Sequence, residues 1–257
     1  MGTSDGLVTV WEVATGKRLF RLKGHTVRIT GLNFSRDGQA LASGSFDGLA
    51  KLWRLPPRSE GRILLEKQPT YLGLAYSPDG EWLATCGAPA RLWHARNEKV
   101  ERPLETTKRL AFSPDSKVLA TGADDALIKL WDVPGGRLLR TLKGRPTASN
   151  RDLRMVGSIA FSTDGQLLAV GSGWPTMGLG NYDQIVQVWE VQSGREICAL
   201  PHNNTITSLA FSPDGNTLAQ PVTTTPYGSG RWQPGARYTN LYAPLLLRRW
   251  LSRPTAR

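Results

Sequence analysis

Three side chains in one stretch of the sequence are of the types that carry out nucleophilic catalysis. Ser43, His25 and Asp47 could act as the nucleophile, general base and orienting acid of a hydrolase. A further serine, Ser4, lies in the string Gly-Thr-Ser-Asp-Gly (2–6), which matches the nucleophile elbow. We reject that match because the elbow needs a strand-to-helix turn, whereas this string is predicted to join two strands. The role of the other three depends on the elements that carry them.

The sequence shows no motif typical of a metal site or a phosphate-binding loop. Its histidines and cysteines are too scattered to suggest metal ligands, and Gly16-Lys17 lacks the upstream glycine of a P-loop. Both cysteines lie in predicted strands, which favours buried free thiols and a reducing, cytoplasmic setting. We therefore expect no catalytic residue, no metal and no cofactor. The histidines and cysteines are His25, His94, His202, Cys86 and Cys198.

A repeat with a period near 40 residues positions these side chains. A Ser-x-Asp turn follows an aromatic residue five times, at intervals of 42, 36, 49 and 50 residues. A tryptophan then ends a later strand of each period. Such turns join short strands, and about four strands per period are typical of a β-propeller blade. The aromatic residues are Phe34, Tyr76, Phe112, Phe161 and Phe211, and the tryptophans are Trp11, Trp53, Trp93, Trp131 and Trp189.

This pattern resembles the WD40 repeat family. The resemblance implies an all-β propeller of four-stranded antiparallel blades, about five in number, as a closed ring or an incomplete arc. It also suggests a bacterial-type WD40 protein, or a truncated fragment of a larger one, because family propellers usually have seven blades. The matching segments are Gly24-His25, LASGSFDG (41–48), KLW (51–53), LATGADDALIKLWD (119–132), LAVGSG (168–173) and VQVWE (186–190).

We expect the propeller to span residues 1–219. The first segment has only the third and fourth strands of a blade and the last has only the first and second, so 6–23 could complete the blade begun by 205–219. The repeat 67–106 is eroded, because it lacks the acidic residue of the second turn. The expected parts are a partial blade (1–23), four repeats (24–66, 67–106, 107–144, 145–200), a partial blade (201–219) and an irregular Arg/Pro-rich tail (220–257).

The family resemblance implies a structural role for the serine, histidine and aspartate. In WD40 blades a buried His, Ser or Thr, Asp and Trp hydrogen-bond to one another across the blade. Such a network holds the link before the first strand against the third strand. We therefore interpret these residues as a structural tetrad rather than a catalytic triad. The matching residues are His25, Ser43, Asp47 and Trp53.

The net charge of +11 is concentrated at the C-terminal end, where six arginines and no acidic residue follow Asp214. Such a tail could attract nucleic acid or anionic lipid through counterion release. Its aromatic residues are scattered, however, and the simpler interpretation is a solvated tail with no nucleic acid partner. No apolar run approaches the ~18–20 residues of a membrane span, so we expect no membrane association.

Two classes of function remain open. The favoured one is a non-enzymatic scaffold that binds protein partners through propeller loops, and the alternative is an enzyme or small-ligand binder that uses the central channel. Both enlarged connections of repeat 145–200 should open on the same face and carry side chains typical of interfaces. They could also be tolerated insertions. These candidate partner-binding residues are Arg145, Arg151, Arg154, Trp174, Met177 and Tyr182.

Overall fold

The computed structural model describes residues 5–56, 61–65, 73–95, 99–123, 127–143, 156–172, 184–202, 206 and 208–219. The chain forms two compact units. The first comprises Met1–Ala123 and Ile128–Arg140, and the second comprises Asp124–Leu127 and Thr141–Arg257. The predicted tail, 220–257, lies outside the described residues.

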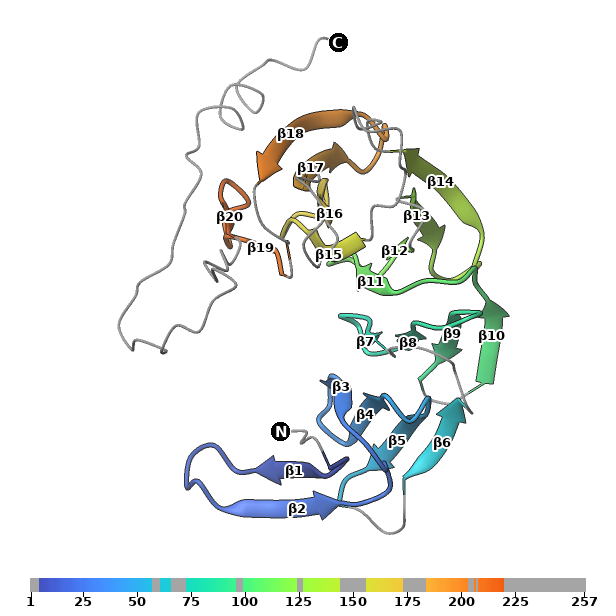
Figure 1. Ribbon diagram of the computed structural model, residues 1–257, viewed down its shortest axis with the longest axis vertical. Coiled ribbons are helices and arrows are strands. Elements are labelled where there is room, and N and C mark those ends of the chain that lie inside the picture. Colours follow the sequence, from blue (N-terminus) through green and yellow to red (C-terminus); the bar gives the residue numbers. More distant parts are fainter. Residues whose placement is uncertain are drawn as a thin grey trace, which may run out of the picture. The chain divides into compact units, whose positions relative to one another are not determined.

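The first unit is built from antiparallel sheets whose strands follow one another in sequence order (Figure 1). A two-stranded sheet comes first, and three four-stranded sheets follow; the last strand, β14, continues into the residues of the second unit. The strands are β1 (Val8–Trp11) and β2 (Arg18–Leu22); β3 (Ile29–Phe34), β4 (Ala40–Ser45), β5 (Ala50–Arg54) and β6 (Arg62–Leu65); β7 (Leu74–Tyr76), β8 (Trp82–Thr85), β9 (Arg91–His94) and β10 (Lys99–Pro103); and β11 (Arg109–Phe112), β12 (Val118–Gly122), β13 (Leu127–Asp132) and β14 (Leu138–Lys143).

The second unit has the same kind of sheet. One four-stranded antiparallel sheet is followed by a two-stranded one. Its strands are β15 (Val156–Phe161), β16 (Leu167–Ser172), β17 (Gln184–Glu190) and β18 (Glu196–His202), then β19 (Ala210–Phe211) and β20 (Leu218–Ala219). The all-β prediction, with four-stranded antiparallel sheets, is confirmed.

The repeat 67–106 forms a complete sheet, β7–β10, although its second turn lacks the acidic residue. Leu83 of β8 lies opposite Trp93 of β9, and the same leucine–tryptophan pairing joins Leu41 to Trp53 in β3–β6. Both leucines and both tryptophans are buried. The apolar pair is therefore sufficient to set the register here, and the acidic turn residue is not required for the sheet to form.

The Ser-x-Asp turns close the first hairpin of the four four-stranded sheets and the β19–β20 hairpin in the same way. Ser35 Oγ donates to Asp37 Oδ1 at 2.6 Å, and this carboxylate also accepts the N–H of Gln39. The same serine–aspartate bond recurs in the other four turns, so turn chemistry accounts for the repeated acidic residues. The remaining pairs are Ser77–Asp79, Ser113–Asp115, Ser162–Asp164 and Ser212–Asp214.

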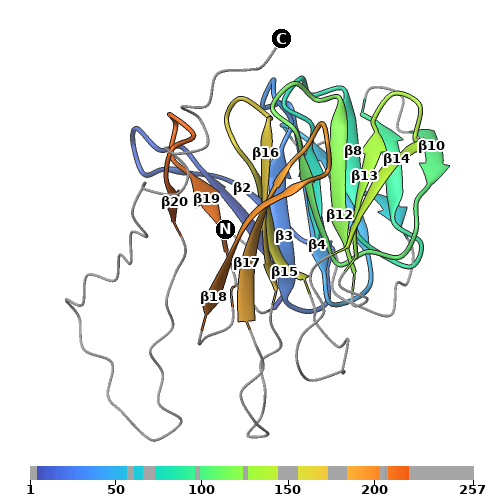
Figure 2. The same ribbon diagram turned by 90° about the horizontal axis from the view of Figure 1, so that it is seen from above.

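The core of the first unit lies between neighbouring sheets. The tryptophan at the end of β5 packs with Val8 and Leu22 of the β1–β2 sheet, while Leu52 and Ala42 pack on the other face against Leu83 of β8. Small residues in the second strand let the sheets approach closely. Figure 2 shows the strands of this unit running along a common direction, so their turns gather at two opposite ends. We call the end with the connection between second and third strands the second-turn end.

Candidate functional site

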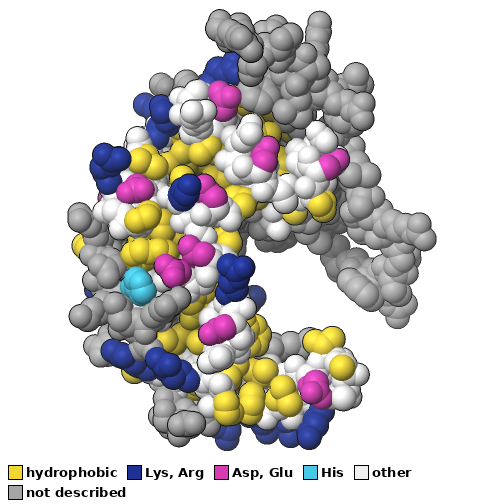
Figure 3. All heavy atoms as spheres, turned by 180° about the vertical axis from the view of Figure 1, so that it is seen from behind, with side chains coloured by type: hydrophobic (Ala, Val, Ile, Leu, Met, Phe, Trp, Pro, Cys, Tyr) yellow, Lys and Arg dark blue, Asp and Glu magenta, His cyan; other side chains and the backbone are white. Residues whose placement is uncertain are grey.

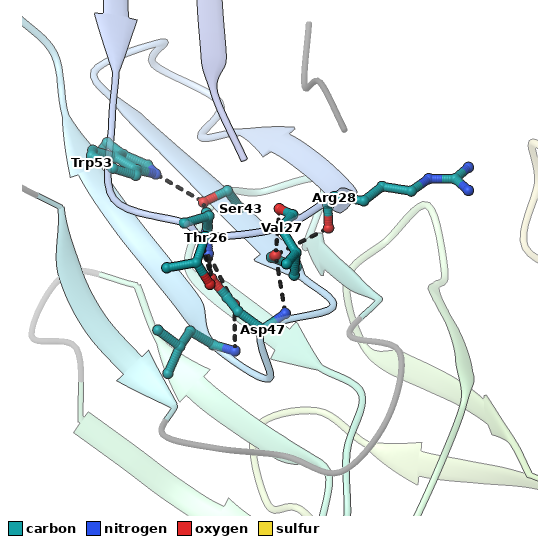
Figure 4. Close-up of polar contacts among 9 residues, drawn as sticks. Thr26, Val27, Arg28, Ser43, Asp47 and Trp53 are labelled. Atoms are coloured by element: carbon teal, nitrogen blue, oxygen red, sulfur yellow. Dashed lines mark hydrogen bonds and ion pairs between the residues drawn. The ribbon is translucent and has the colours of Figure 1, made fainter. Parts of the chain in front are cut away.

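The residues of the predicted tetrad form one continuous chain of hydrogen bonds in sheet β3–β6 (Figure 4). Trp53 Nε1 donates to Ser43 Oγ at 2.9 Å, and Ser43 Oγ lies 2.8 Å from His25 Nε2. The other ring nitrogen, His25 Nδ1, lies 2.9 Å from Asp47 Oδ2. An ionised Asp47 can only accept, so Nδ1 carries the proton and the Ser43 hydroxyl donates to Nε2.

Two backbone groups complete the coordination of Asp47. The N–H of Thr26 donates to Oδ2 and the N–H of Leu49 donates to Oδ1, each at 3.0 Å. Burial raises the pKa of Asp47, but these two donors and His25 outweigh burial and hold that pKa below its usual value. Burial also lowers the pKa of His25, against the raising effect of Asp47. The network therefore favours a neutral imidazole beside a carboxylate.

The geometry of Ser43, His25 and Asp47 is that of a hydrolase triad, but the serine cannot serve as a nucleophile. Its side chain is completely buried, with an exposed fraction of 0 %. Its oxygen already accepts the indole N–H of Trp53 and its proton is directed at His25. A nucleophile must meet its substrate with a free lone pair, so this arrangement supports structure rather than acyl transfer.

The other sheets retain different parts of this network. Trp93 Nε1 donates to Thr85 Oγ1 at 3.1 Å, and Trp131 Nε1 donates to Thr121 Oγ1 at 2.8 Å. In β15–β18 the corresponding position is Val170, and the buried Nε1 of Trp189 has no hydrogen-bond partner. An unpaired buried donor costs stability, so this sheet is held less firmly at its centre.

An exposed patch lies beside the tetrad at the second-turn end; we call it the Val27–Phe46 patch, and it comprises Val27, Arg28 and Phe46. The exposed fractions of Val27 and Phe46 are 41 % and 54 %. The buried hydroxyl of Ser45 donates to the carbonyl oxygens of Val27 and Arg28, each at 3.0 Å. The N–H of Phe46 donates to the same carbonyl oxygen of Arg28 at 3.0 Å. The Arg28 side chain points away from this network (Figure 4).

The Val27–Phe46 patch was not predicted from the sequence. Its residues come from two segments, the link before β3 and the turn between β4 and β5, and only the hairpin brings them together. The signal that could have found it is Phe46, a large apolar residue at a turn position next to Asp47 of the tetrad. The six residues predicted for partner binding, from Arg145 to Tyr182, all lie outside the described residues.

A groove of 1040 Å³ lies between sheets β3–β6 and β7–β10, at the end opposite the second-turn end. Arg36, Arg54 and Arg62 line it together with Asp37, Asp79 and Glu81. The carboxylates of Asp37 and Asp79 are engaged by the serines of their own turns. The charges of the lining balance, so the groove shows no preference for a ligand of one sign.

Other kinds of site were sought in the described part of the chain. No three His, Cys, Asp or Glu side chains there gather closely enough to hold a metal ion. No helix in it is long and apolar enough to cross a membrane. Cys86 is a buried free thiol, as predicted, and burial raises its pKa to about 12, whereas the free thiol of Cys198 is only half-buried. Basic and acidic side chains are interspersed on the face drawn in Figure 3.

Four-stranded antiparallel meanders that bury a tryptophan at the end of the third strand define the blades of a β-propeller. The chain belongs to the WD40 family, described as "WD domain, G-beta repeat". The family profile matches more than half of the chain, at residues 16–54, 107–132, 136–190 and 194–220. It does not match residues 55–106, where the eroded repeat nevertheless forms β7–β10.

Several eukaryotic proteins are similar to this chain. It is 27 % identical over 146 residues to "Pre-mRNA-processing factor 19" of Oryza sativa, which covers 52 % of this chain and 28 % of that protein. It is 24 % identical over 226 residues to "Protein HIR1" of Cryptococcus neoformans, which covers 79 % of this chain and 25 % of that protein. The chain thus spans less than a third of the length of these relatives. They give no support to the expected bacterial origin.

Among solved structures, the chain resembles a component of the "Crystal Structure of Mitotic Checkpoint Complex", with a TM-score of 0.69 and 25 % sequence identity. The match covers 86 % of this chain and 66 % of that one. The similarity supports the propeller fold, and the structural neighbour is part of a multiprotein complex.

Proposed function

We propose that this protein is a non-enzymatic scaffold that binds protein partners in the cytoplasm through the second-turn end of its sheets. The observation that carries the proposal is the Val27–Phe46 patch, an exposed apolar pair mounted on buried hydrogen bonds. Family membership supports a role in protein interactions, and the fully buried Ser43 argues against triad chemistry. The proposal therefore rests on the site as well as on the fold.

The backbone of the patch is held by hydrogen bonds before any partner binds. Ser45 fixes the backbone of Val27 and Arg28, while Asp47 fixes that of Thr26. A rigid aromatic side chain loses little conformational freedom on binding, so more of its contact energy appears as affinity. Phe46 is therefore well suited to anchor an interface.

The charge of the patch indicates the partner's chemistry. Arg28 is exposed beside Val27 and Phe46, whereas Asp47 is turned inward and bonded to His25. A partner surface that places an apolar side chain next to a carboxylate would meet both features. The predicted residues Arg145, Arg151, Arg154, Trp174, Met177 and Tyr182 extend this proposal to the connections of the fourth repeat.

Photo-crosslinking at Phe46 tests the proposal. A photoreactive phenylalanine analogue at position 46 should capture defined proteins from a cell extract, and the same analogue at Ile63 should not. Ile63 is a matched control because it is 44 % exposed but lies on the fourth strand, away from the second-turn end. Adding Val27→Ser and Arg28→Ser should abolish capture. Equal capture at both positions would remove the evidence for this surface.

The alternative of a channel enzyme or channel ligand binder predicts a different outcome. Partner capture would then be insensitive to Val27 and Arg28, and a small molecule would protect the protein against thermal unfolding. Among the described residues, no gathering of acids and histidines favours this alternative over the scaffold.

A further inference from the structure

Lys51, in the third strand β5, is a buried cation that pairs with no carboxylate of the described residues. Its exposed fraction is 6 %. Its ammonium Nζ lies 5.9 Å from the centroid of the Trp53 ring, a cation–π contact that replaces only part of its hydration. The carboxylate of the adjoining turn, Asp47, is taken up by His25 and by backbone N–H groups. A buried ammonium without an anion costs free energy, so this position would gain from a carboxylate supplied from outside.

The ammonium of Lys51 lies against the link that joins β2 to β3. A methyl group on Gly24 would come within 2.8 Å of Lys51 Nζ and 3.1 Å of the Trp53 ring. Glycine at this place therefore leaves the room that the lysine occupies. The residue before it in the link, Lys23, is exposed. The buried lysine is thus followed to the surface by a second positive charge on the same link.

Sheet β11–β14 shows which group fits these two positions. Lys129 of β13 stands two residues before the strand's tryptophan, as Lys51 does in β5, and it forms an ion pair with Glu105. Glu105 corresponds to Lys23, because each directly follows a buried leucine and leads into the link before the first strand. The Glu105 side chain is 57 % exposed, so the pair can be reached from solvent. The same two positions hold an ion pair in one sheet and two lysines in the other.

We propose that Lys51 and Lys23 form a site for one carboxylate side chain of a protein partner. The carboxylate enters at the position that Glu105 holds in sheet β11–β14, and both ammonium groups donate hydrogen bonds to it. A glutamate fits, because the ion pair Lys129–Glu105 is built from the same two positions. The inference rests on the proposed scaffold role and names one group of the partner. The site is tested without that partner, so the two proposals can fail separately.

N-acetylglutamate α-amide, which carries a single carboxylate, is the probe. The full chain is labelled with ¹³C-lysine, and the signals of Lys51 and Lys23 are assigned with Lys51→Arg and Lys23→Arg. At low salt the probe should shift both signals saturably, whereas the neutral N-acetylglutamine α-amide should shift neither. Lys17 is the internal control, because it is exposed in the turn between β1 and β2. Its signal should not saturate with the other two.

A charge swap in the link tests the geometry. Lys23→Glu places a carboxylate of the chain's own where Glu105 stands in the other sheet, so it should weaken probe affinity by at least about tenfold. Lys17→Glu makes the same change in net charge and should weaken it by less than about twofold, through the loss of long-range attraction. Lys23→Glu should also raise the urea unfolding midpoint, and this rise should disappear when Lys51→Met is added.

Three results would overturn the proposal. The first is a titration in which the Lys51 signal does not shift. The second is equal weakening by Lys23→Glu and Lys17→Glu, which would reflect net charge alone. The third is binding that appears only in Glu60→Gln or Glu66→Gln, because the site would then belong to a carboxylate of this chain; both glutamates lie outside the described residues. Circular dichroism of each variant verifies that it is folded before it is titrated.

Discussion

Sheets β3–β6 and β15–β18 have the same strand order and the same leucine–tryptophan pairing, but they differ beside the tryptophan's indole. In β3–β6 the indole N–H of Trp53 reaches the hydroxyl of Ser43, which also bonds His25. In β15–β18 Val170 takes the place of the serine, and the indole N–H of Trp189 is buried without a partner. Both sheets nevertheless form, with Trp53 2 % and Trp189 5 % exposed.

The comparison separates two roles of the repeat's signature residues. The pairs Leu41–Trp53 and Leu168–Trp189 keep the register in both sheets, because each buries a large apolar surface. Sheet β15–β18 has Val170 in place of Ser43, so it forms without the hydroxyl that links the tryptophan to the histidine in β3–β6. The effect of that hydroxyl must therefore lie in stability and in holding the second-turn end in place.

Breaking the polar chain at Asp47 should have the largest effect. Asp47→Ala leaves His25 Nδ1 and the backbone N–H groups of Thr26 and Leu49 without their acceptor. We expect a loss of about 1–3 kcal/mol in the free energy of unfolding, the cost of orphaned buried polar groups. Urea unfolding followed by circular dichroism measures it. Asp37→Ala, in an exposed turn, is the control and should cost less.

His25→Ala should fall in the same range, since it leaves the Ser43 hydroxyl without its acceptor and Asp47 without its side-chain donor, both in a buried site. Partner capture at the Val27–Phe46 patch should decline only in step with folding. An unchanged unfolding midpoint accompanied by loss of a hydrolytic activity would contradict the structural interpretation of the tetrad.

The comparison can also be tested by adding the missing hydroxyl to sheet β15–β18. Val170→Thr places an acceptor opposite Trp189 Nε1, as Thr121 does for Trp131. We expect a gain of about 0.5–1.5 kcal/mol, the net value of a buried hydrogen bond. Amide hydrogen exchange of β16 and β17 should slow accordingly.

A control for this variant is Val186→Thr in the neighbouring strand. Val186 is 1 % exposed and lies opposite Gly171, one residue along from Val170, so its hydroxyl would be buried on the other face of the sheet from the indole. This substitution should destabilise the sheet, because it buries a polar group without supplying the missing acceptor. If both threonines slowed exchange equally, the unpaired indole would not be the cause.

The sequence predicted the four-stranded sheets, because they depend on short motifs with a fixed spacing; the same spacing suggested the tetrad. Ser-x-Asp-Gly sets the first turn, and a leucine and a tryptophan in neighbouring strands set the register. The Val27–Phe46 patch could not be found in this way, because exposure depends on how two separate segments meet. The repeat 67–106, predicted as an eroded blade, forms β7–β10, and the apolar Leu83–Trp93 pair accounts for its register without the acidic turn residue.

Acid should reduce the stability of sheet β3–β6 by a smaller amount, through the tetrad's histidine and aspartate. Because burial lowers the pKa of folded His25 below its unfolded value of 6.5, the unfolded chain binds more protons and stability decreases as pH falls below about 6.5. The lowered pKa of Asp47 removes further stability below about 3.8. The protection of β4 and β5 against hydrogen exchange, taken relative to the intrinsic rate at each pH, should therefore fall near pH 6 in wild type.

His25→Gln should abolish the component of this loss of protection near pH 6 while retaining the component at lower pH. The matched control is His94→Gln, which removes a histidine from the neighbouring sheet β7–β10. That variant should keep the acid response of β4 and β5. A response that disappears in both variants would not come from the tetrad.

The smallest expected effect concerns the first turns, where the two units link neighbouring turns through different hydroxyls. In the first unit Ser116 Oγ accepts the N–H of Asp79 at 3.0 Å, and in the second Thr163 Oγ1 donates to the carbonyl of Pro213 at 2.8 Å. Ser116 occupies a left-handed conformation, φ 62°, where the corresponding residue of the preceding turn, Gly80, has φ 80°. A non-glycine residue there carries a backbone cost of about 1–2 kcal/mol, which the hydrogen bond to Asp79 offsets.

This balance predicts an order among variants rather than one large change. Ser116→Gly loses the hydrogen bond but also relieves the left-handed strain, so its unfolding free energy should stay within about 0.5 kcal/mol of wild type. Ser116→Ala keeps the strain and loses the bond, and should be about 1 kcal/mol less stable. In the second unit, Thr163→Val loses the hydrogen bond to Pro213. Because Thr163 does not have a positive φ, Thr163→Gly should relieve no strain and should gain no stability over Thr163→Val. Thr163→Gly completes the set of four variants, and urea unfolding midpoints give their relative stabilities. If Ser116→Gly were as unstable as Ser116→Ala, strain at this turn would contribute nothing.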